Sequence, residues 1–485
     1  MCLACFFVYN TNMIFNGRER DVPWTVYGLV FSLGVLILLR LNYLFPRFSD
    51  GSIYLYLSYL VGDGLVPYRD FFYSSPPLIP YLFSWYGKLF GFSWQAFGYI
   101  PLGLSLIDAV IIYWLVLKNG SRLGALSGAV LYSLSFANLA TSDFTSDVHV
   151  VLTLVLLGAV ASQKRWPIIS GVFFGLAVLT KLYAVVVLVG WVAGLVWDKK
   201  WREMIKFVIS SLLVIGVVAG VLWWWVGNVF YEQVILSHAG KVEGLARKEI
   251  ILFFIRHDWA LILAPLGWLL VRRKMPAWIL LPVVALVGWT ALWSDFYYLY
   301  LKVLVAWLAL WWGWVIAQLD EKVQRREFTY VVIVGLLIIS GLTISRYIDE
   351  QAEAAVIQPL DEVVEYVQSH TVEGEAIYGS FEVTPLVALG AGRPIWHNVV
   401  DTNIKFFQTG WFDMEKRESG IKQDKVRIII TKVLLVKGGR MATGPEELLP
   451  RKFFNENCRL GKSWPVEKDY THNAVAVWLC DYNDQ

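Results

Sequence analysis

Long apolar runs separated by short polar loops fill the first two thirds of this chain. The first run, residues 24–45, reaches the length of about 20 residues that a helix needs to cross the apolar core of a bilayer. Only 17% of the 485 residues are charged, whereas a soluble protein carries about 25%. The sequence therefore predicts an α-helical polytopic membrane protein.

About eleven membrane-spanning helices are expected from these runs. Their ranges are 24–45, 97–117, 123–139, 148–161, 167–179, 182–197, 205–226, 259–271, 276–293, 300–319 and 328–344. The apolar segment 77–90 is shorter and carries Trp85, Tyr86 and Lys88. We expect this segment to lie on the membrane surface as an amphipathic helix rather than to cross the bilayer.

Basic residues gather in alternate loops between the expected spans. They are Lys118 and Arg122, Lys164 and Arg165, and those of residues 199–202, 272–274 and 322–326. Short cytoplasmic loops carry an excess of Lys and Arg. We therefore expect a multi-pass protein of the cell membrane, with its N-terminus in the cytoplasm and its C-terminus outside. The net charge of +3 indicates no nucleic-acid partner.

The composition becomes polar and mixed from about residue 345. Residues 361–369 have helical periodicity, and 376–378, 426–431, 433–436 and 474–480 have the character of short strands. We expect a cytoplasmic segment at 1–23, a transmembrane catalytic domain at 24–344 and a small extracytoplasmic α/β domain at 345–485. In that last domain, Cys458 and Cys480 are either a disulfide or two unpaired core residues.

The loop after the first span is the richest in chemistry. It runs from residue 48 to 91 and places two apolar pieces around a polar loop that holds Arg69 and Asp70. This pattern is typical of an element on a membrane surface. Asp50 opens it, and two interpretations of Asp50 remain: a general base that takes a proton from an acceptor hydroxyl, or a solvated charge that caps a helix. The residue alone favours the cap.

Further charged residues fall on the same expected side. Asp143 and Asp147 lie in LATSDFTSDVHVV, where one is expected to cap a helix and the other to orient an acceptor or hold a metal. Lys181, in the tight turn of GLAVLTKLYAV, suits a phosphate or a carboxylate partner, or its side chain snorkels to the interface. Asp108 lies inside an apolar run, and a structural hydrogen bond across helices would account for it.

The long outer loop, residues 230–258, adds cations and aromatic side chains. Its candidates for chemistry are Tyr231, His238, Lys248 and Arg256. Cations beside a membrane suit a lipid phosphate, although nonspecific contact with headgroups explains most of them better.

In this order of motifs the chain resembles the GT-C glycosyltransferases of the protein O-mannosyltransferase and lipid A aminoarabinose transferase group. The resemblance covers about residues 24–320. It is carried by FSDGSIY, GDGLVPYRDFFYSSPPL, KLFG, SDVHVV, GLAVLTK and FYYLYLKVL. Two departures stand out. Gly51 follows Asp50 where many members have Glu, and Ser74 and Ser75 precede Pro76 where the aminoarabinose transferases have Lys.

The resemblance implies a GT-C fold and transfer of a monosaccharide from a polyprenyl- or dolichyl-phosphate donor, with inversion, to a glycan, lipid or protein acceptor. Asp50 would be the base and Asp147 the second acidic residue. The donor phosphate would be bound by Lys181, Arg69, Arg256 and Lys248. The acceptor would be bound by Asp143, Tyr231, His238 and Tyr298. A divalent metal between Asp147 and His238 would be an optional cofactor.

The main alternative is a flippase or transporter of a lipid-linked sugar. Such a protein is expected to show inverted repeats and polar residues in the middle of the membrane, and neither is visible in this sequence. A third interpretation, a receptor that senses through its C-terminal domain, leaves the loop at 48–91 without a function.

Overall fold

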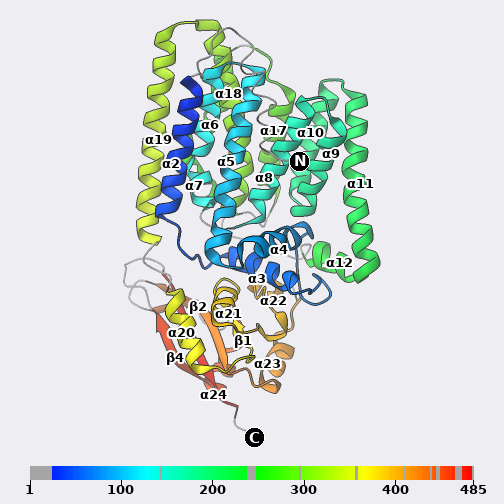
Figure 1. Cartoon of the computed structure of the whole chain (residues 1–485), viewed down its shortest axis with the longest axis vertical. Coiled ribbons are helices and arrows are strands. Elements are labelled where there is room, and N and C mark those ends of the chain that lie inside the picture. Colours follow the sequence, from blue (N-terminus) through cyan, green and yellow to red (C-terminus); the bar gives the residue numbers. More distant parts are fainter. Residues whose placement is uncertain are drawn as a thin grey trace.

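The computed structural model describes residues 24–142, 145–237, 247–271, 273–293, 297–354, 359–408, 410–436, 440–443, 448–464 and 472–482. Figure 1 shows three layers: a tall bundle of helices, two helices lying across one end of it, and a small α/β unit beyond them. The N-terminal segment expected at 1–23 lies outside the described residues.

Most apolar runs singled out in the sequence coincide with one helix, whereas the runs 123–139 and 259–271 are each divided between two helices. The bundle contains α2 (Trp24–Asn42), α5 (Trp94–Asn119), α6 (Arg122–Ser133), α8 (Asp147–Gln163), α9 (Pro167–Thr180), α10 (Ala184–Trp197), α11 (Trp201–Val226), α14 (Arg247–His257), α15 (Trp259–Ile262), α16 (Ala264–Val271), α17 (Ala277–Leu292), α18 (Leu301–Val323) and α19 (Arg326–Ala354). In the described part, five helices are long and apolar enough to cross a membrane, or six if the pair bent by 94° at residue 258 is one span. The helices α8, α9, α10 and α17 are apolar but shorter.

The centre of the bundle is α18, whose apolar window is 83% buried. It packs closely on α6 because small residues face each other. A Cβ added at Gly124 would lie 2.4 Å from the carbonyl oxygen of Gly313, and one added at Gly128 would lie 3.0 Å from that of Ala309. Such small-residue contacts let helix backbones approach in membrane proteins.

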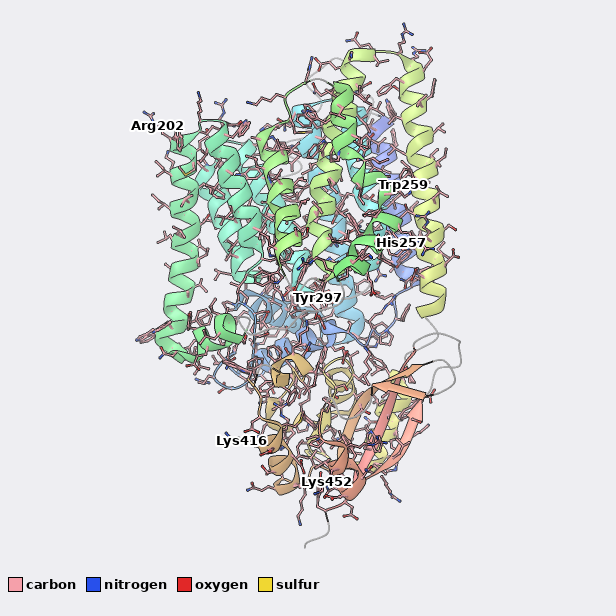
Figure 2. The ribbon with its side chains drawn as sticks, turned by 180° about the vertical axis from the view of Figure 1, so that it is seen from behind. Arg202, His257, Trp259, Tyr297, Lys416 and Lys452 are labelled. Carbon is pink, nitrogen blue, oxygen red and sulfur yellow. A yellow bond between two sulfur atoms is a disulfide. The ribbon has the colours of Figure 1, made fainter. Side chains whose placement is uncertain are left out.

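The five basic loops gather at one end of the bundle. Lys118 Nζ donates to the carbonyl oxygen of Gln163, and Lys274 lies 5.5 Å from the ring centre of Trp197. The connections α5–α6, α16–α17 and α18–α19 line one shared hollow. Figure 2 shows Arg202 at this end, away from the C-terminal unit. The loops that the sequence placed on one side of the membrane therefore lie together at one end of the bundle.

The opposite end holds the two crossing helices, α3 (Asp50–Gly62) and α4 (Leu78–Phe90). The expected surface helix at 77–90 is α4. Helix α3 differs from the expectation, because it lies between the bundle and the C-terminal unit and most of its residues are buried. Short elements complete this end: α7 (Phe136–Thr141), α12 (Val229–Tyr231), the π-helical η1 (Glu232–Leu236) and the 3₁₀ turn η2 (Tyr298–Tyr300).

The C-terminal unit is a small sheet flanked by helices. Its helical elements are α20 (Leu360–His370), α21 (Thr384–Ala391), η3 (Trp396–Asn398), α22 (Ile404–Gln408), α23 (Met414–Gln423) and α24 (Arg451–Asn457). Its strands are β1 (Ile377–Gly379), β2 (Ile428–Val436), β3 (Arg440–Thr443), β4 (Cys458–Trp464) and β5 (His472–Cys480). The strand order is β1-β2-β5-β4, with β3 paired to β2. Only β1 and β2 are parallel among these pairs.

The expected strands at 426–431 and 433–436 are one continuous strand, β2. Strands β3 and β4 were not expected, since five successive residues of β4 are exposed and show no alternation. The open question about the cysteines is answered in favour of pairing, because Cys458 and Cys480 form a disulfide between β4 and β5.

The C-terminal unit docks on the platform that α3 and α4 form. Ser52 Oγ on α3 donates to the carbonyl oxygen of Glu382 at 2.6 Å. The backbone N–H of Ile395 donates to the hydroxyl of Tyr56 at 3.0 Å. The ring of Phe72 lies 4.9 Å from those of both Phe406 and Phe412, measured between centroids.

Candidate active site

Asp50 is the first residue of α3, at the junction of all three layers. Ser49 caps this helix, since its Oγ accepts from the backbone N–H of Gly51 at 3.3 Å. The interpretation of Asp50 as the helix cap is therefore wrong, because Ser49 makes the capping hydrogen bond. Asp50 is exposed, yet protein surrounds it on many sides. Partial desolvation, followed by the negative charge of Glu382, raises the pKa of Asp50 above its usual 3.8.

Asp147 lies nearby at the start of α8 and is 1% exposed. Ser146 caps this helix, so the capping role expected for one of the two local aspartates does not belong to Asp147. Asp147 Oδ2 lies 2.8 Å from Lys181 Nζ and accepts a hydrogen bond of 2.7 Å from the hydroxyl of Tyr54. Tyr54 follows Asp50 by four residues, which places both on one face of α3.

Lys181 follows α9 directly, in the turn that leads to α10. Besides Asp147, its Nζ contacts Ser75 Oγ at 3.4 Å. Ser75 belongs to the loop between α3 and α4, at the place where the aminoarabinose transferases carry a lysine. Lys181 thus connects the bundle to the platform, and its side chain keeps 19% of its surface exposed.

Gly51 explains how these groups come together. A Cβ at Gly51 would lie 3.1 Å from the carbonyl oxygen of Thr145 and 3.3 Å from its nitrogen. The first turn of α3 therefore packs directly on the backbone that leads into α8, with Asp50 on one element and Asp147 on the other. The departure from the Glu seen in many GT-C members has a steric cause here.

The other predicted site residues lie elsewhere. Arg69 is 52% exposed and forms a salt bridge of 2.8 Å with its neighbour Asp70. Tyr231, on α12, is 42% exposed and its ring packs near Trp223. Lys248 and Arg256 are exposed residues of α14. The structure gives these four residues no contact with Asp50, Asp147 or Lys181 among the described interactions.

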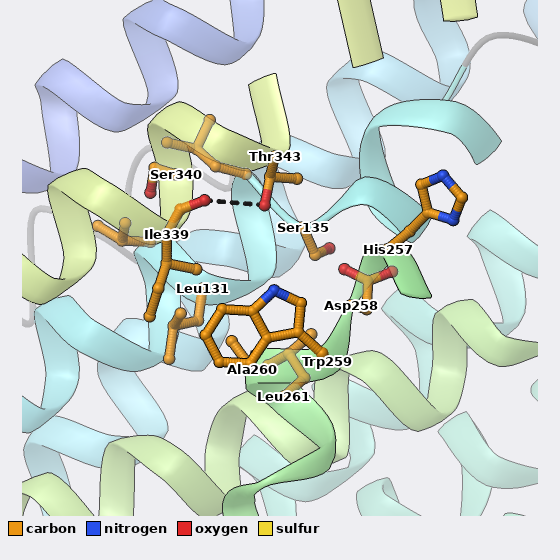
Figure 3. Close-up of a pocket in the computed structure, with 12 residues that line it drawn as sticks. Leu131, Ser135, His257, Asp258, Trp259, Ala260, Leu261, Ile339, Ser340 and Thr343 are labelled. Carbon is orange, nitrogen blue, oxygen red and sulfur yellow. Dashed lines mark hydrogen bonds between the residues drawn. The ribbon is translucent and has the colours of Figure 1, made fainter. Parts of the chain in front are cut away.

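Tyr298 belongs to a separate cluster at the bend between α14 and α15. Its hydroxyl donates to Asp258 Oδ2 at 3.3 Å, and Asp258 also accepts from the backbone N–H groups of Phe136 and Ala137, both at 2.9 Å. Figure 3 shows Asp258 and His257 at the edge of a cavity beside α19. The cavity is about 20 Å³, which is room for one water molecule. Its lining contains none of the predicted site residues.

Two predicted residues, Asp143 and His238, lie outside the described residues, and with them the metal site expected at Asp147 and His238. Within the described ranges, no group of three or more His, Cys, Asp or Glu side chains is arranged to hold a metal ion.

A fully buried polar network lies one turn inside the bundle, and it includes Lys302, which the sequence analysis had not singled out. Lys302 Nζ donates to Ser105 Oγ at 3.0 Å and to His149 Nδ1 at 2.5 Å. His149 Nε2 lies 2.9 Å from the carbonyl oxygen of Thr141, so Nε2 carries the proton and Nδ1 accepts. The network holds the first turn of α8, and therefore Asp147, against α5 and α18.

Asp108 has the structural role expected from the sequence. Its carboxylate accepts hydrogen bonds from the hydroxyls of Thr153 on α8, at 2.7 Å, and of Tyr132 on α6, at 3.0 Å. Each bond joins Asp108 on α5 to a neighbouring helix, so the buried carboxylate finds its hydrogen-bond partners inside the bundle.

Residues 74–224 match the family model described as dolichyl-phosphate-mannose-protein mannosyltransferase. No curated protein matches the sequence. ArnT from Cupriavidus metallidurans, solved with undecaprenyl phosphate, is similar in structure with a TM-score of 0.62 and 12% identity, over 94% of this chain and 98% of that chain. The chain has the GT-C fold. This result confirms the fold class expected from the sequence.

A second GT-C structure supports the same conclusion. AglB from Archaeoglobus fulgidus, solved with an inhibitory peptide and a dolichol-phosphate, has a TM-score of 0.53 at 13% identity, over 84% of this chain and 69% of that chain. The family match at 74–224 contains Ser75, Asp147 and Lys181, whereas Asp50 lies before it.

Proposed function

We propose that this protein is a membrane glycosyltransferase. It transfers a monosaccharide from a polyprenyl- or dolichyl-phosphate donor to an acceptor hydroxyl on the outer face of the membrane, with inversion. The observation that carries the proposal is an accessible carboxylate, Asp50, beside a lysine that a buried carboxylate holds in place. The family match and the lipid phosphates named with ArnT and AglB support the donor class.

The two aspartates have different roles because their surroundings differ. Asp147 Oδ2 already accepts from Lys181 and Tyr54, and the residue is almost fully buried. Asp50 is exposed, and its raised pKa makes it a stronger base than an ordinary carboxylate. Asp50 is therefore the group that takes the proton of the acceptor hydroxyl, and Asp147 positions Lys181.

In the proposed reaction, the acceptor oxygen attacks the anomeric carbon of the donor as Asp50 takes its proton. The bond from the anomeric carbon to the phosphate oxygen breaks, and the electron pair leaves with the lipid phosphate. Attack opposite to the leaving group inverts the anomeric carbon. Lys181 has three N–H donors, and its described contacts use two, on Asp147 and Ser75. The third N–H is proposed to stabilise the developing charge on the phosphate.

The orientation in the membrane follows from the two ends of the bundle. The five basic loops lie at the end far from α3, α4 and the C-terminal unit, and the positive-inside rule assigns that end to the cytoplasm. The candidate site and residues 345–485 would then lie outside the cytoplasm, beyond a membrane domain at 24–344. The Cys458–Cys480 disulfide suits that compartment.

Transfer of labelled sugar by the purified protein in liposomes tests the proposal. The donors are a panel of polyprenyl-phosphate monosaccharides, and a cell-envelope extract supplies acceptors. We expect transfer by the wild type and by Asp63→Asn, which changes an exposed aspartate at the other end of α3, but not by Asp50→Asn. Equal transfer by Asp50→Asn would remove Asp50 from catalysis. Donor movement across the liposome without any transfer would instead support the flippase.

A further inference from the structure

The C-terminal unit brings an ion pair to the candidate site. Glu382 lies in the turn between β1 and α21, and Lys432 lies on the neighbouring strand β2. Lys432 Nζ is 3.2 Å from Glu382 Oε1, and each side chain is 20% exposed. The turn is fixed on the strand, because Ser380 Oγ accepts from the backbone N–H of Lys432 at 2.8 Å.

This ion pair lies directly beside the start of α3. The carbonyl oxygen of Glu382 accepts the hydrogen bond of 2.6 Å from Ser52 Oγ, and Ser52 is two residues from Asp50. The contact joins positions 330 residues apart in sequence. A charged pair held beside the first turn of α3 forms part of the surroundings that an acceptor bound at Asp50 would meet.

The charges around Asp50 come from two layers of the molecule. Glu382 and Asp147 raise its pKa, whereas Lys181 and Lys432 lower it. The bundle thus supplies one carboxylate and one lysine, and the C-terminal unit supplies another of each. Among these four charges, the effect of Glu382 is the largest.

We propose that the Glu382–Lys432 pair forms one wall of the active site and sets the strength of Asp50 as a base. Both are positioning residues, because they act through Asp50 rather than on the sugar. The inference rests on the proposed function, and it gives the C-terminal unit a part in catalysis. The charge of Glu382 raises the pKa of Asp50, and the charge of Lys432 lowers it.

Opposite effects of the two partners distinguish this role from a structural one. If the pair were only a structural contact, removing either partner would break the same contact, and both variants would change activity in the same direction. As charges near Asp50, Glu382 raises its pKa and Lys432 lowers it. We expect Glu382→Gln to move the acid limb of the pH profile of kcat/KM to lower pH by about half a unit, and Lys432→Met to move it to higher pH by a similar amount.

The double variant and a matched control complete the first measurement. Glu382→Gln with Lys432→Met should return the acid limb close to its wild-type position, because the two charges are then removed together. Glu418→Gln is the control, since it breaks the 2.7 Å pair with Lys422 on α23, in the same unit. Figure 1 shows α23 farther from α3 than α22 is. The pH profile of the Glu418→Gln variant should therefore keep its acid limb at the wild-type position.

A second measurement needs no sugar transfer. Asp50 is accessible, so a water-soluble carbodiimide and an amine label its carboxyl only in the protonated form, and mass spectrometry of the peptide reads the extent. We expect the midpoint pH of labelling to fall in Glu382→Gln and to rise in Lys432→Met. If the protein transfers no sugar, the proposed function fails while this test of the charges still stands. Equal midpoints, or shifts in one direction, would overturn the inference.

Discussion

Lys181 and Asp147 form an ion pair of 2.8 Å in which the carboxylate is almost fully buried and the lysine is one-fifth exposed. They come from different elements, the start of α8 and the turn between α9 and α10. The pair therefore fixes the relative position of these helices as well as the direction of the ammonium group. The same carboxylate oxygen holds the hydroxyl of Tyr54, so α3 is part of the same unit.

The substitution Asp147→Asn should destabilise the protein and reduce transfer together. It leaves the ammonium group of Lys181 without its charged partner, and breaking a buried pair in this way costs ~3 kcal/mol. Thermal unfolding in detergent measures the loss. Tyr54→Phe, which removes one hydrogen bond from the same oxygen, should cost only about 1 kcal/mol. A larger loss in Tyr54→Phe than in Asp147→Asn would contradict this view of the pair.

The substitution Lys181→Met should reduce kcat by about 100-fold if its ammonium group stabilises the leaving phosphate, as for other groups that meet transition-state charge. Turnover of a saturating donor by the purified, folded variant is the measurement. Lys88→Met is the matched control, because Lys88 is an exposed lysine in the last turn of α4. A change in KM for the donor with kcat intact would assign Lys181 to binding alone.

The rate of transfer should fall on the acid side at a pH above the usual 3.8 of an aspartate. Asp50 acts as a base only when it is ionised, and partial desolvation with the charge of Glu382 raises its pKa. The pH dependence of stability has the opposite sign. The contribution of Asp50 to the free energy of unfolding is fully present at low pH and is lost as the pH rises through its raised pKa. A profile of kcat/KM against pH, with the unfolding temperature recorded at each point, checks both.

The substitution Gly51→Ala should disturb the site from its backbone side. Its Cβ would meet the carbonyl oxygen of Thr145 at 3.1 Å, and such overpacking costs about 1–3 kcal/mol. Unfolding temperature and transfer activity should both fall. Gly34→Ala in α2, where nothing lies within 4 Å of the added Cβ, should leave activity unchanged. Full activity in Gly51→Ala would show that the first turn of α3 can shift without moving Asp50.

The cysteines of β4 and β5 should resist alkylation until a reductant is added. Their disulfide closes a separation of 22 residues, and opening a loop of that size costs about 3 kcal/mol. Mass spectrometry of protein from intact membranes, alkylated with and without reductant, detects the bond. Complete alkylation without reductant would contradict both the pairing and the outer location proposed for this unit.

The arrangement of the bundle could be predicted from sequence because apolar length and loop charge are local properties. The same patterns placed Asp50, Asp147 and Lys181 at one end, and a lysine in a tight turn suggested the carboxylate partner that the structure shows. The capping roles considered for Asp50 and Asp147 were wrong because a serine precedes each of them, and Ser49 and Ser146 make the bonds.

The remaining features depend on contacts between distant parts of the chain. Nothing near Glu382 in the sequence indicates Ser52, and nothing near Lys302 indicates His149. Residues 247–257 were expected in an outer loop, but they form α14, which is bent by 94° from the helical segment Trp259–Val271. Tyr298 lies at that bend and bonds to Asp258, although the family resemblance had assigned it to the acceptor site. A helical spacing of four residues between Asp50 and Tyr54 was a local signal that could have found Tyr54.

The shortness of α9 and α10 affects the lipid as well as the protein. Each has 14 residues, which span about 21 Å at 1.5 Å per residue, while the hydrocarbon of a bilayer is ~30 Å thick. A span shorter than the hydrocarbon is accommodated by local thinning of the bilayer, which we expect beside the turn that carries Lys181. The headgroup layer would then dip there, and the phosphate of the proposed donor would stay among other headgroups when it meets the lysine. The proposed function therefore predicts that the acyl-chain length of the surrounding membrane affects how well the donor is positioned.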